Sequence, residues 1–193
     1  MKPYPIEHRA SLYNTAYPHL APLLVHKGFT IGFWFLGGGR HGGTSFYGAY
    51  SAEYLKRIAT LFPDAAKIVH LFAGNMPPGD YIRVGIDPTG TGTPDIEGDA
   101  EHLSSFLPFH PDLIYADPPY SVEDSEHYQK AMVNRPKVLS ECAAVLRPGG
   151  WLVWLDQALP VFSNDVWKWR GCISYIRSTG NRFRCVNLFQ RLL

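Results

Sequence analysis

Hydrophobic residues follow two different patterns along this chain, and the change falls near residue 67. Before residue 67 the apolar positions show no sustained period, apart from one apolar run and one segment of helical spacing. After it, short apolar runs recur, and the first five close on a glycine or an acidic residue. Such runs predict the buried strands of a mostly parallel sheet, whose ligand lies at the C-terminal ends of the strands. They occupy residues 68–74, 81–87, a short stretch ending at 98–99, then 113–117, 151–156, 169–176 and 183–189.

Two helices are predicted between these runs. Residues 52–62 carry apolar side chains at helical spacing, with Ser51 as a candidate N-cap and Pro63 as the stop. Residues 134–146 form the second helix, which the Pro-Gly-Gly sequence at 148–150 ends. Strands that alternate with helices are typical of an α/β fold.

The two ends of the chain are predicted to differ from this parallel middle. Near the N-terminus, residues 31–36 form an apolar run that predicts a buried strand, broken by three glycines. At the C-terminus, the last two runs are joined by the turn-like residues 178–181 and predict an antiparallel hairpin. We expect residues 1–50 to form an extension packed on the core, and residues 51–193 to form the main domain.

Composition and charge narrow the class of protein. The chain has 193 residues and 21.7 kDa, with 46% hydrophobic and 18% charged residues, which fits one folded domain and excludes a disordered chain. No apolar run has the length of a membrane-spanning helix, and the N-terminal residues lack the apolar core of a signal peptide. The three cysteines, Cys142, Cys172 and Cys185, lie far apart in apolar runs and are expected to be free, buried thiols. We therefore expect a cytoplasmic protein with no membrane association.

The net charge of +1 hides an uneven distribution. Residues 80–126 contain eleven acidic side chains and one basic one, whereas residues 164–193 contain six basic side chains and one acidic one. The acidic middle and the basic C-terminal stretch fit either ordinary solvated surface or two regions with different partners.

The most specific motif is Asp117-Pro118-Pro119-Tyr120, which directly follows a predicted strand. With this motif and the strand-terminal acids before it, residues 67–193 resemble the class I S-adenosylmethionine-dependent amino-methyltransferases, and among them the DNA adenine-N6 enzymes. The resemblance implies a Rossmann-like methyltransferase fold, with a seven-stranded, mostly parallel sheet that ends in an antiparallel hairpin. It implies S-adenosylmethionine as the cofactor and the four motif residues as the catalytic site.

The chemistry of an amino group on a base explains such a motif. Its nitrogen is a poor nucleophile, because the lone pair is delocalised into the ring. The Asp117 carboxylate and a proline-held backbone carbonyl can accept both amino hydrogens, which frees the lone pair for attack on a sulfonium methyl. Tyr120 offers a flat face on which an extruded base can stack. Without such a role, the motif would be a proline-stiffened turn with an aspartate cap.

By the same resemblance, further residues are expected to bind the cofactor. Phe72-Ala73-Gly74 match the first cofactor motif, Asp87 matches the acid that binds the ribose hydroxyls, and Asp99-Ala100 match the contacts to the adenine amino group. Tyr50, in an aromatic stretch before the first helix, is a candidate wall of the pocket, although aromatic residues there are also typical of a core. The histidines show no metal-ligand spacing, and no metal is expected.

The chain departs from the family pattern at the first crossover. His70 stands where the family usually has an acid, and Met76 where it usually has a glycine. Only six residues, 75–80, separate Gly74 from the next run, whereas a parallel crossover normally takes a dozen or more. We therefore expect the first crossover helix to be missing, and the run at 31–36 to fill the gap.

The target of the reaction is less closely determined. Arg177, Arg182 and Arg184 flank the last predicted turn and are candidates for binding nucleic-acid phosphates. By the resemblance, the four-residue motif is more typical of adenine-N6 than of cytosine-N4 targets. Adenine N6 in DNA is therefore the first expectation, and an amino group of an RNA base is the alternative, because small RNA methyltransferases share the motif. Sequence specificity would be low, or would come from residues 1–50 or from a partner subunit. A different class of function stays open, a non-catalytic, cofactor-binding subunit of a larger complex.

Overall fold

The computed structural model describes residues 4–36, 52–74, 76–86, 94–119, 132–177 and 183–193. Its helices are α1 (Ile6–Ala16), α2 (Ala52–Leu61), the 3-10 helix η1 (Ala100–Ser105) and α4 (Arg135–Val145). Its strands are β1 (Leu24–His26), β2 (Phe29–Leu36), β3 (Ile68–Leu71), β4 (Ile82–Gly85), β5 (Ile96–Glu97), β6 (Leu113–Ala116), β7 (Trp151–Asp156), β8 (Trp167–Arg177) and β9 (Phe183–Arg191).

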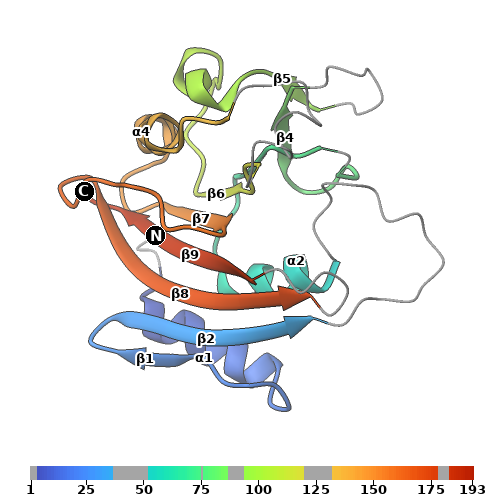
Figure 1. Ribbon diagram of the computed structural model, residues 1–193, viewed down its shortest axis with the longest axis vertical. Coiled ribbons are helices and arrows are strands. Elements are labelled where there is room, and N and C mark those ends of the chain that lie inside the picture. The colour runs from blue at the N-terminus through green and yellow to red at the C-terminus, as the bar shows by residue number, and fades with distance from the viewer. Residues whose placement is uncertain (1–3, 37–51, 75, 87–93, 120–131, 178–182) are drawn as a thin grey trace.

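All nine of these strands form one sheet, in the order β1-β2-β8-β9-β7-β6-β3-β4-β5 (Figure 1). β1 and β9 run against the other seven strands. β8 and β9 form the antiparallel hairpin that the sequence predicts. Seven strands from β5 to β8 make up the expected mixed sheet, and β2 and β1 extend it by two strands beyond the expected number.

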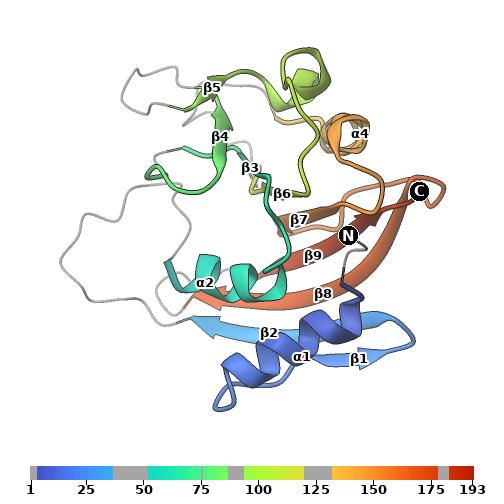
Figure 2. The ribbon, with the colours of Figure 1, turned by 180° about the vertical axis from the view of Figure 1, so that it is seen from behind.

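Helices cover both faces of the sheet. α1 and α2 pack side by side on one face (Figure 2), where their side chains form a buried cluster with Trp34, Tyr115 and Val153. η1 and α4 cover the other face, where Leu103 and Leu139 pack against the sheet. Every residue of β7 is buried, because this strand lies between the two layers. The central strands therefore read as continuous apolar runs, as expected for a sheet that is covered on both sides.

The N-terminal extension joins the sheet at the opposite end from the first crossover. β2 pairs in parallel with β8 and is separated from β3 by four other strands. The expectation that residues 31–36 fill the crossover gap is therefore wrong. The strand is also only half buried. Trp34 and Leu36 face the α1–α2 cluster, whereas Ile31, Phe33 and Phe35 are exposed on the other face. A run of adjacent apolar residues does not show that the side chains on one face of the strand remain exposed to solvent.

The crossover from β3 to β4 contains no helix among residues 72–74 and 76–81, as the sequence predicts. Side chains of the crossover and of the neighbouring strands pack against one another there instead. The ring of His70 lies 4.5 Å from that of Tyr81 and 4.4 Å from that of Tyr115. Met76 is buried, and its carbonyl oxygen accepts a hydrogen bond of 2.8 Å from Nη1 of Arg83. A folded linker therefore replaces the helix.

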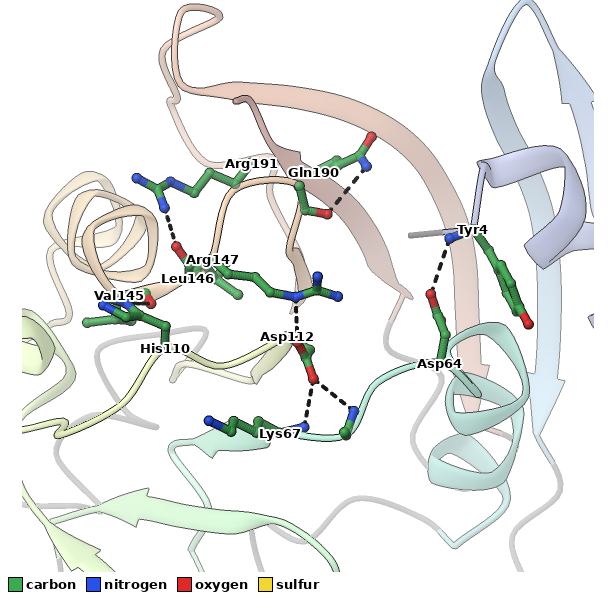
Figure 3. A network of polar contacts seen from close by, with 12 residues as sticks. Tyr4, Asp64, Lys67, His110, Asp112, Val145, Leu146, Arg147, Gln190 and Arg191 are labelled. Carbon is green, nitrogen blue, oxygen red and sulfur yellow. Dashed lines mark hydrogen bonds and ion pairs between the residues drawn. The ribbon is translucent and has the colours of Figure 1, made fainter. Parts of the chain in front are cut away.

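The N-terminal ends of β3 and β6 are closed by a polar network, which Figure 3 shows. Oδ2 of Asp112 accepts hydrogen bonds of 2.9 Å from the backbone N–H groups of Ala66 and Lys67. Its other oxygen forms an ion pair with Arg147. Nearby, Asp64 accepts a hydrogen bond from the backbone N–H of Tyr4. The acids at this edge of the sheet are held by the chain itself.

Most predicted elements are found close to their expected limits. α2 begins at Ala52 and ends one residue before the expected end, and α4 has Asn134 as its N-cap. α1 and η1 were not predicted, because neither carries a strong helical pattern of apolar residues. All three cysteines are free, but only Cys142 is buried; Cys172 and Cys185 are half-buried. No helix in the described part of the chain is long and apolar enough to cross a membrane.

Candidate functional site

The C-terminal ends of β3, β6 and β7 lie next to one another at one edge of the sheet. Leu71 of β3 pairs with Ala116 of β6, and Ala116 pairs with Trp154 of β7. Phe72 and Asp117, each one residue further along, therefore leave the sheet on adjacent strands. This is the edge at which open α/β sheets bind their ligands.

The half-buried Asp117 acts electrostatically on Tyr54 of α2, which is also influenced by Tyr175 of β8 and Arg184 of β9. Tyr54 of α2 packs edge-to-face on Tyr175 of β8, with ring centres 5.5 Å apart, and the guanidinium carbon of Arg184 lies 5.8 Å from the Tyr175 ring centre. Burial raises the pKa of Tyr54 well above its ordinary value, and the negative charge of Asp117 raises it further, whereas Arg184 opposes the shift. Tyr54 thus stays a neutral phenol beside the carboxylate. The cluster combines an acceptor, flat aromatic rings and one cation.

The carbonyl group of Pro119, two residues after Asp117, is held by Arg135. Nη2 of Arg135, the first residue of α4, donates a hydrogen bond of 3.2 Å to the Pro119 carbonyl oxygen. Its Nε donates to Oδ2 of Asp156 at 2.6 Å. Asp156 ends β7, is fully buried, and also accepts from the indole N–H of Trp154 at 3.1 Å. The end of β6, the start of α4 and the end of β7 are joined in this way.

A sharp turn follows β3. Phe72 has φ 58° and Gly74 has φ 50°, both in the left-handed region. Glycine adopts this conformation readily, but a phenylalanine there costs about 1–2 kcal/mol. The backbone N–H of Ala73 donates to the carbonyl of Val84, which ties the turn to the neighbouring strand. Strain of this kind is characteristic of functional turns.

The acid after β5 has a structural role that can be seen directly. Asp99 is the N-cap of η1, and its Oδ1 accepts a hydrogen bond of 2.9 Å from the backbone N–H of Glu101. The Asp99 side chain is exposed, whereas Ala100 is buried. A capping role and a ligand role are compatible, because a carboxylate has two oxygens.

The structure brings only some of the predicted site residues together. Phe72, Asp117 and Pro118 lie at the shared edge, and Arg184 of β9 acts electrostatically on Tyr54 together with Asp117. Arg177 ends β8. Ala73, Gly74 and Pro119 continue the same two segments, whereas Asp99 and Ala100 follow β5, which lies two strands away from β3. Four predicted residues lie outside the described part of the chain: Tyr50, Asp87, Tyr120 and Arg182. No three His, Cys, Asp or Glu residues among those described are close enough to hold a metal ion.

Four residues at this edge were not identified from the sequence as part of a site: Tyr54, Arg135, Asp156 and Tyr175. Asp156 could have been recognised as a site residue, because it closes an apolar run in the same way as Asp117. Tyr54 and Tyr175 are indistinguishable from core aromatic residues in a sequence. Arg135 is one basic residue at a helix start, and only the fold brings it to Asp156.

The strand order from β5 to β8, with β9 antiparallel, defines the Rossmann-like methyltransferase fold. The solved structure of TrmN agrees with this fold. TrmN from Thermus thermophilus has a TM-score of 0.50 at 18% identity, over 72% of this chain and 48% of that one. CalS10 from Micromonospora echinaspora, an amino pentose methyltransferase with S-adenosylmethionine bound, has a TM-score of 0.36 at 15% identity, over 74% of this chain and 75% of that one. This chain thus spans about half the length of TrmN. No family model matches the chain, and no curated protein matches it.

Proposed function

We propose that this protein is an S-adenosylmethionine-dependent methyltransferase that modifies an exocyclic amino nitrogen of a nucleobase, adenine N6 in DNA in the first instance. The observation that carries this proposal is the position of Asp117-Pro118-Pro119-Tyr120. The motif leaves the sheet from β6, beside the turn after β3. Two hydrogen-bond acceptors, the Asp117 carboxylate and the Pro118 carbonyl, therefore lie next to the edge at which this fold binds its ligands.

The cofactor fits the residues at the ends of β3 and β5. The backbone is left-handed at Phe72 and Gly74, and a ligand can approach it closely because Ala73 carries only a methyl group and Gly74 no side chain. Asp99 presents an exposed carboxylate beyond β5. We assign the methionine end of the cofactor to residues 72–74, the adenine to Asp99 and Ala100, and the ribose to Asp87. When bound, S-adenosylmethionine supplies an electrophilic methyl group.

The residues of the chain then act mainly by position and charge. The Asp117 carboxylate and the Pro118 carbonyl each accept one hydrogen of the target amino group, which raises the electron density on its nitrogen. The buried rings of Tyr54 and Tyr175 pack against each other, and the Tyr54 phenol lies within electrostatic reach of Asp117. Tyr120 is assigned to stacking on the base. Arg184, with Arg177 and Arg182, is assigned to a phosphate next to the target.

The proposal is tested by transfer of labelled methyl from S-adenosylmethionine to two substrates, plasmid DNA lacking adenine methylation and total RNA. We expect label in DNA as N6-methyladenine, and its loss in Asp117→Ala. Asp165→Ala, at an exposed residue before β8, is the matched control and should keep full activity. Label only in RNA would move the target to an RNA base. No label in either substrate would overturn the proposed activity.

The short β3–β4 crossover favours a second candidate, a non-catalytic subunit that binds the cofactor for a partner. Calorimetry with S-adenosylmethionine and S-adenosylhomocysteine separates the two functions. Binding that is lost in Asp87→Ala, together with methyl transfer, supports the enzyme. Binding without transfer, and with no effect of Asp117→Ala in cells, supports the subunit. No binding of either compound contradicts both.

A further inference from the structure

Arg135 bridges the two strand ends on which the proposed chemistry depends. Its guanidinium donates to the Pro119 carbonyl at 3.2 Å and to both oxygens of Asp156, at 2.6 Å and 3.4 Å. The Arg135 side chain is 19% exposed and that of Asp156 is 1% exposed. An ion pair that is this well shielded is much less screened than one at the surface.

The base of this side chain is itself fixed. Oδ1 of Asn134 accepts a hydrogen bond from the backbone N–H of Lys137, which caps α4. The backbone N–H of Asn134 donates to Oε1 of Glu101 in η1 at 2.8 Å. Pro136 follows Arg135 in the first turn of α4, where proline is favourable because its fixed φ is already helical. The first turn of α4 is therefore anchored before Arg135 reaches the loop after β6.

A hydrogen bond to the Pro119 carbonyl is well placed to restrict the Asp117–Pro119 segment. Pro118 and Pro119 have no backbone N–H, and their rings fix φ, so neither residue can be oriented by donating to the sheet. The remaining freedom is the rotation of the peptide planes, and a hydrogen bond to a carbonyl oxygen restricts it. Pro118 is buried and Pro119 half-buried, so this restraint acts directly beside Asp117.

We propose that Arg135 is a positioning residue, which orients the Asp117–Pro119 segment by clamping the Pro119 carbonyl against Asp156. Its importance for turnover rests on the proposed methyltransferase function, whereas its effect on the peptide does not. Asp156 serves as the fixed counter-ion. Trp154 and the backbone N–H of Gln157 hold it in place, at 3.1 Å and 2.7 Å.

The clamp can be observed without any activity. The chain contains two Pro-Tyr pairs, Pro3-Tyr4 and Pro119-Tyr120. Protein labelled with ¹³C-carbonyl proline and ¹⁵N-tyrosine should therefore give two HNCO cross-peaks, and the first pair serves as an internal reference. We expect Arg135→Gln to move the Pro119 carbonyl signal upfield, as a lost hydrogen bond does. Lys137→Met, in the same helix turn, should move neither signal.

Kinetics then test the consequence for the reaction. We expect Arg135→Gln to lower kcat about 10- to 100-fold, the loss typical of a displaced catalytic group, with the Kd for S-adenosylhomocysteine unchanged. Arg135→Lys keeps a positive charge at Asp156 but has a single donor group, so it should recover only part of the rate. It serves as the second variant if Arg135→Gln fails to fold. Lys137→Met should turn over normally.

Each outcome decides one part of the proposal. An unmoved Pro119 signal in both Arg135 variants overturns the clamp, whatever the activity. A moved signal with normal kcat overturns its role in turnover. If the unaltered protein methylates neither DNA nor RNA, the proposed function fails, and the NMR result alone then decides the clamp. A moved signal with reduced kcat and unchanged cofactor affinity supports both parts.

Discussion

The two ends of β6 carry the same type of residue in opposite situations. Asp112 precedes the strand and Asp117 follows it. Asp112 accepts from two backbone N–H groups and pairs with Arg147, so its role is to join the start of β6 to the start of β3 and to the segment after α4. Asp117 lies at the C-terminal end of the strand and acts electrostatically on the buried Tyr54. The difference teaches that the position on the strand, and not the residue type, separates a structural acid from a candidate catalytic one.

The same contrast extends along both edges of the sheet. At the N-terminal edge, Asp64 accepts from the buried Arg9 at 2.7 Å and 2.9 Å. The Arg9 guanidinium also packs on the rings of Phe62 and Trp151, with centroids 4.6 Å and 4.8 Å away. Burial lowers the pKa of Arg9, although Asp64 opposes the shift. The N-terminal edge therefore contributes stability, whereas the C-terminal edge carries the proposed ligand site.

The largest expected effect is at the N-terminal edge. Asp64→Ala leaves the Arg9 charge buried without its carboxylate, which should lower the free energy of unfolding by about 3–5 kcal/mol. Urea denaturation measures this, with Asp165→Ala as the exposed control. A loss below about 1 kcal/mol would show that the Leu61 and Tyr4 carbonyls, which also accept from Arg9, are sufficient.

At the C-terminal end of β6, Asp117→Asn should lower the turnover number and leave the free energy of unfolding nearly unchanged. It keeps the shape but halves the acceptor capacity, so we expect kcat for methyl transfer to fall about 10²- to 10³-fold. The free energy of unfolding should change by less than about 1 kcal/mol, because Asp117 lies at a ligand edge. Equal losses of stability and activity would place Asp117 in the structural class with Asp112.

Asp112→Ala should show the reverse profile. Two backbone N–H groups lose their acceptor, which should cost about 2 kcal/mol of unfolding free energy, while kcat per folded molecule stays unchanged. Asp112→Asn retains an acceptor oxygen and should lose less. Thermal unfolding, together with the methyl-transfer assay at a temperature where both variants are folded, checks this. A fall in kcat at full stability would remove the distinction between the two ends.

The smallest effect concerns the short crossover. Burial lowers the pKa of His70 from 6.5 to about 3, so the folded protein binds fewer protons than the unfolded chain between these values. The free energy of unfolding should therefore fall as the pH falls below 6.5, by about 1 kcal/mol between pH 6.5 and 5.5. His70→Phe keeps a ring between Tyr81 and Tyr115 and should flatten this slope. An identical slope in both proteins would mean that His70 is not the titrating group.

Sequence patterns predicted the strands well where both faces are covered. β7 and β6 read as unbroken apolar runs because α1 and α2 pack on one face and η1 and α4 on the other. β2 shows where this reading fails. Its run is equally apolar, yet alternate residues are exposed, since a second helical layer does not cover that part of the sheet among the described residues.

The sequence by itself determined the order of the elements, the missing crossover helix and the place of Asp117 directly after a strand. These are local properties, because apolar runs, proline and glycine act on the residues beside them. Only the tertiary structure decided that β2 lies beside β8, that Tyr54 lies within electrostatic reach of Asp117, and that Arg135 reaches both Pro119 and Asp156. These contacts join residues far apart in the chain. Their partners are chosen by the packing of whole layers, which no local pattern encodes.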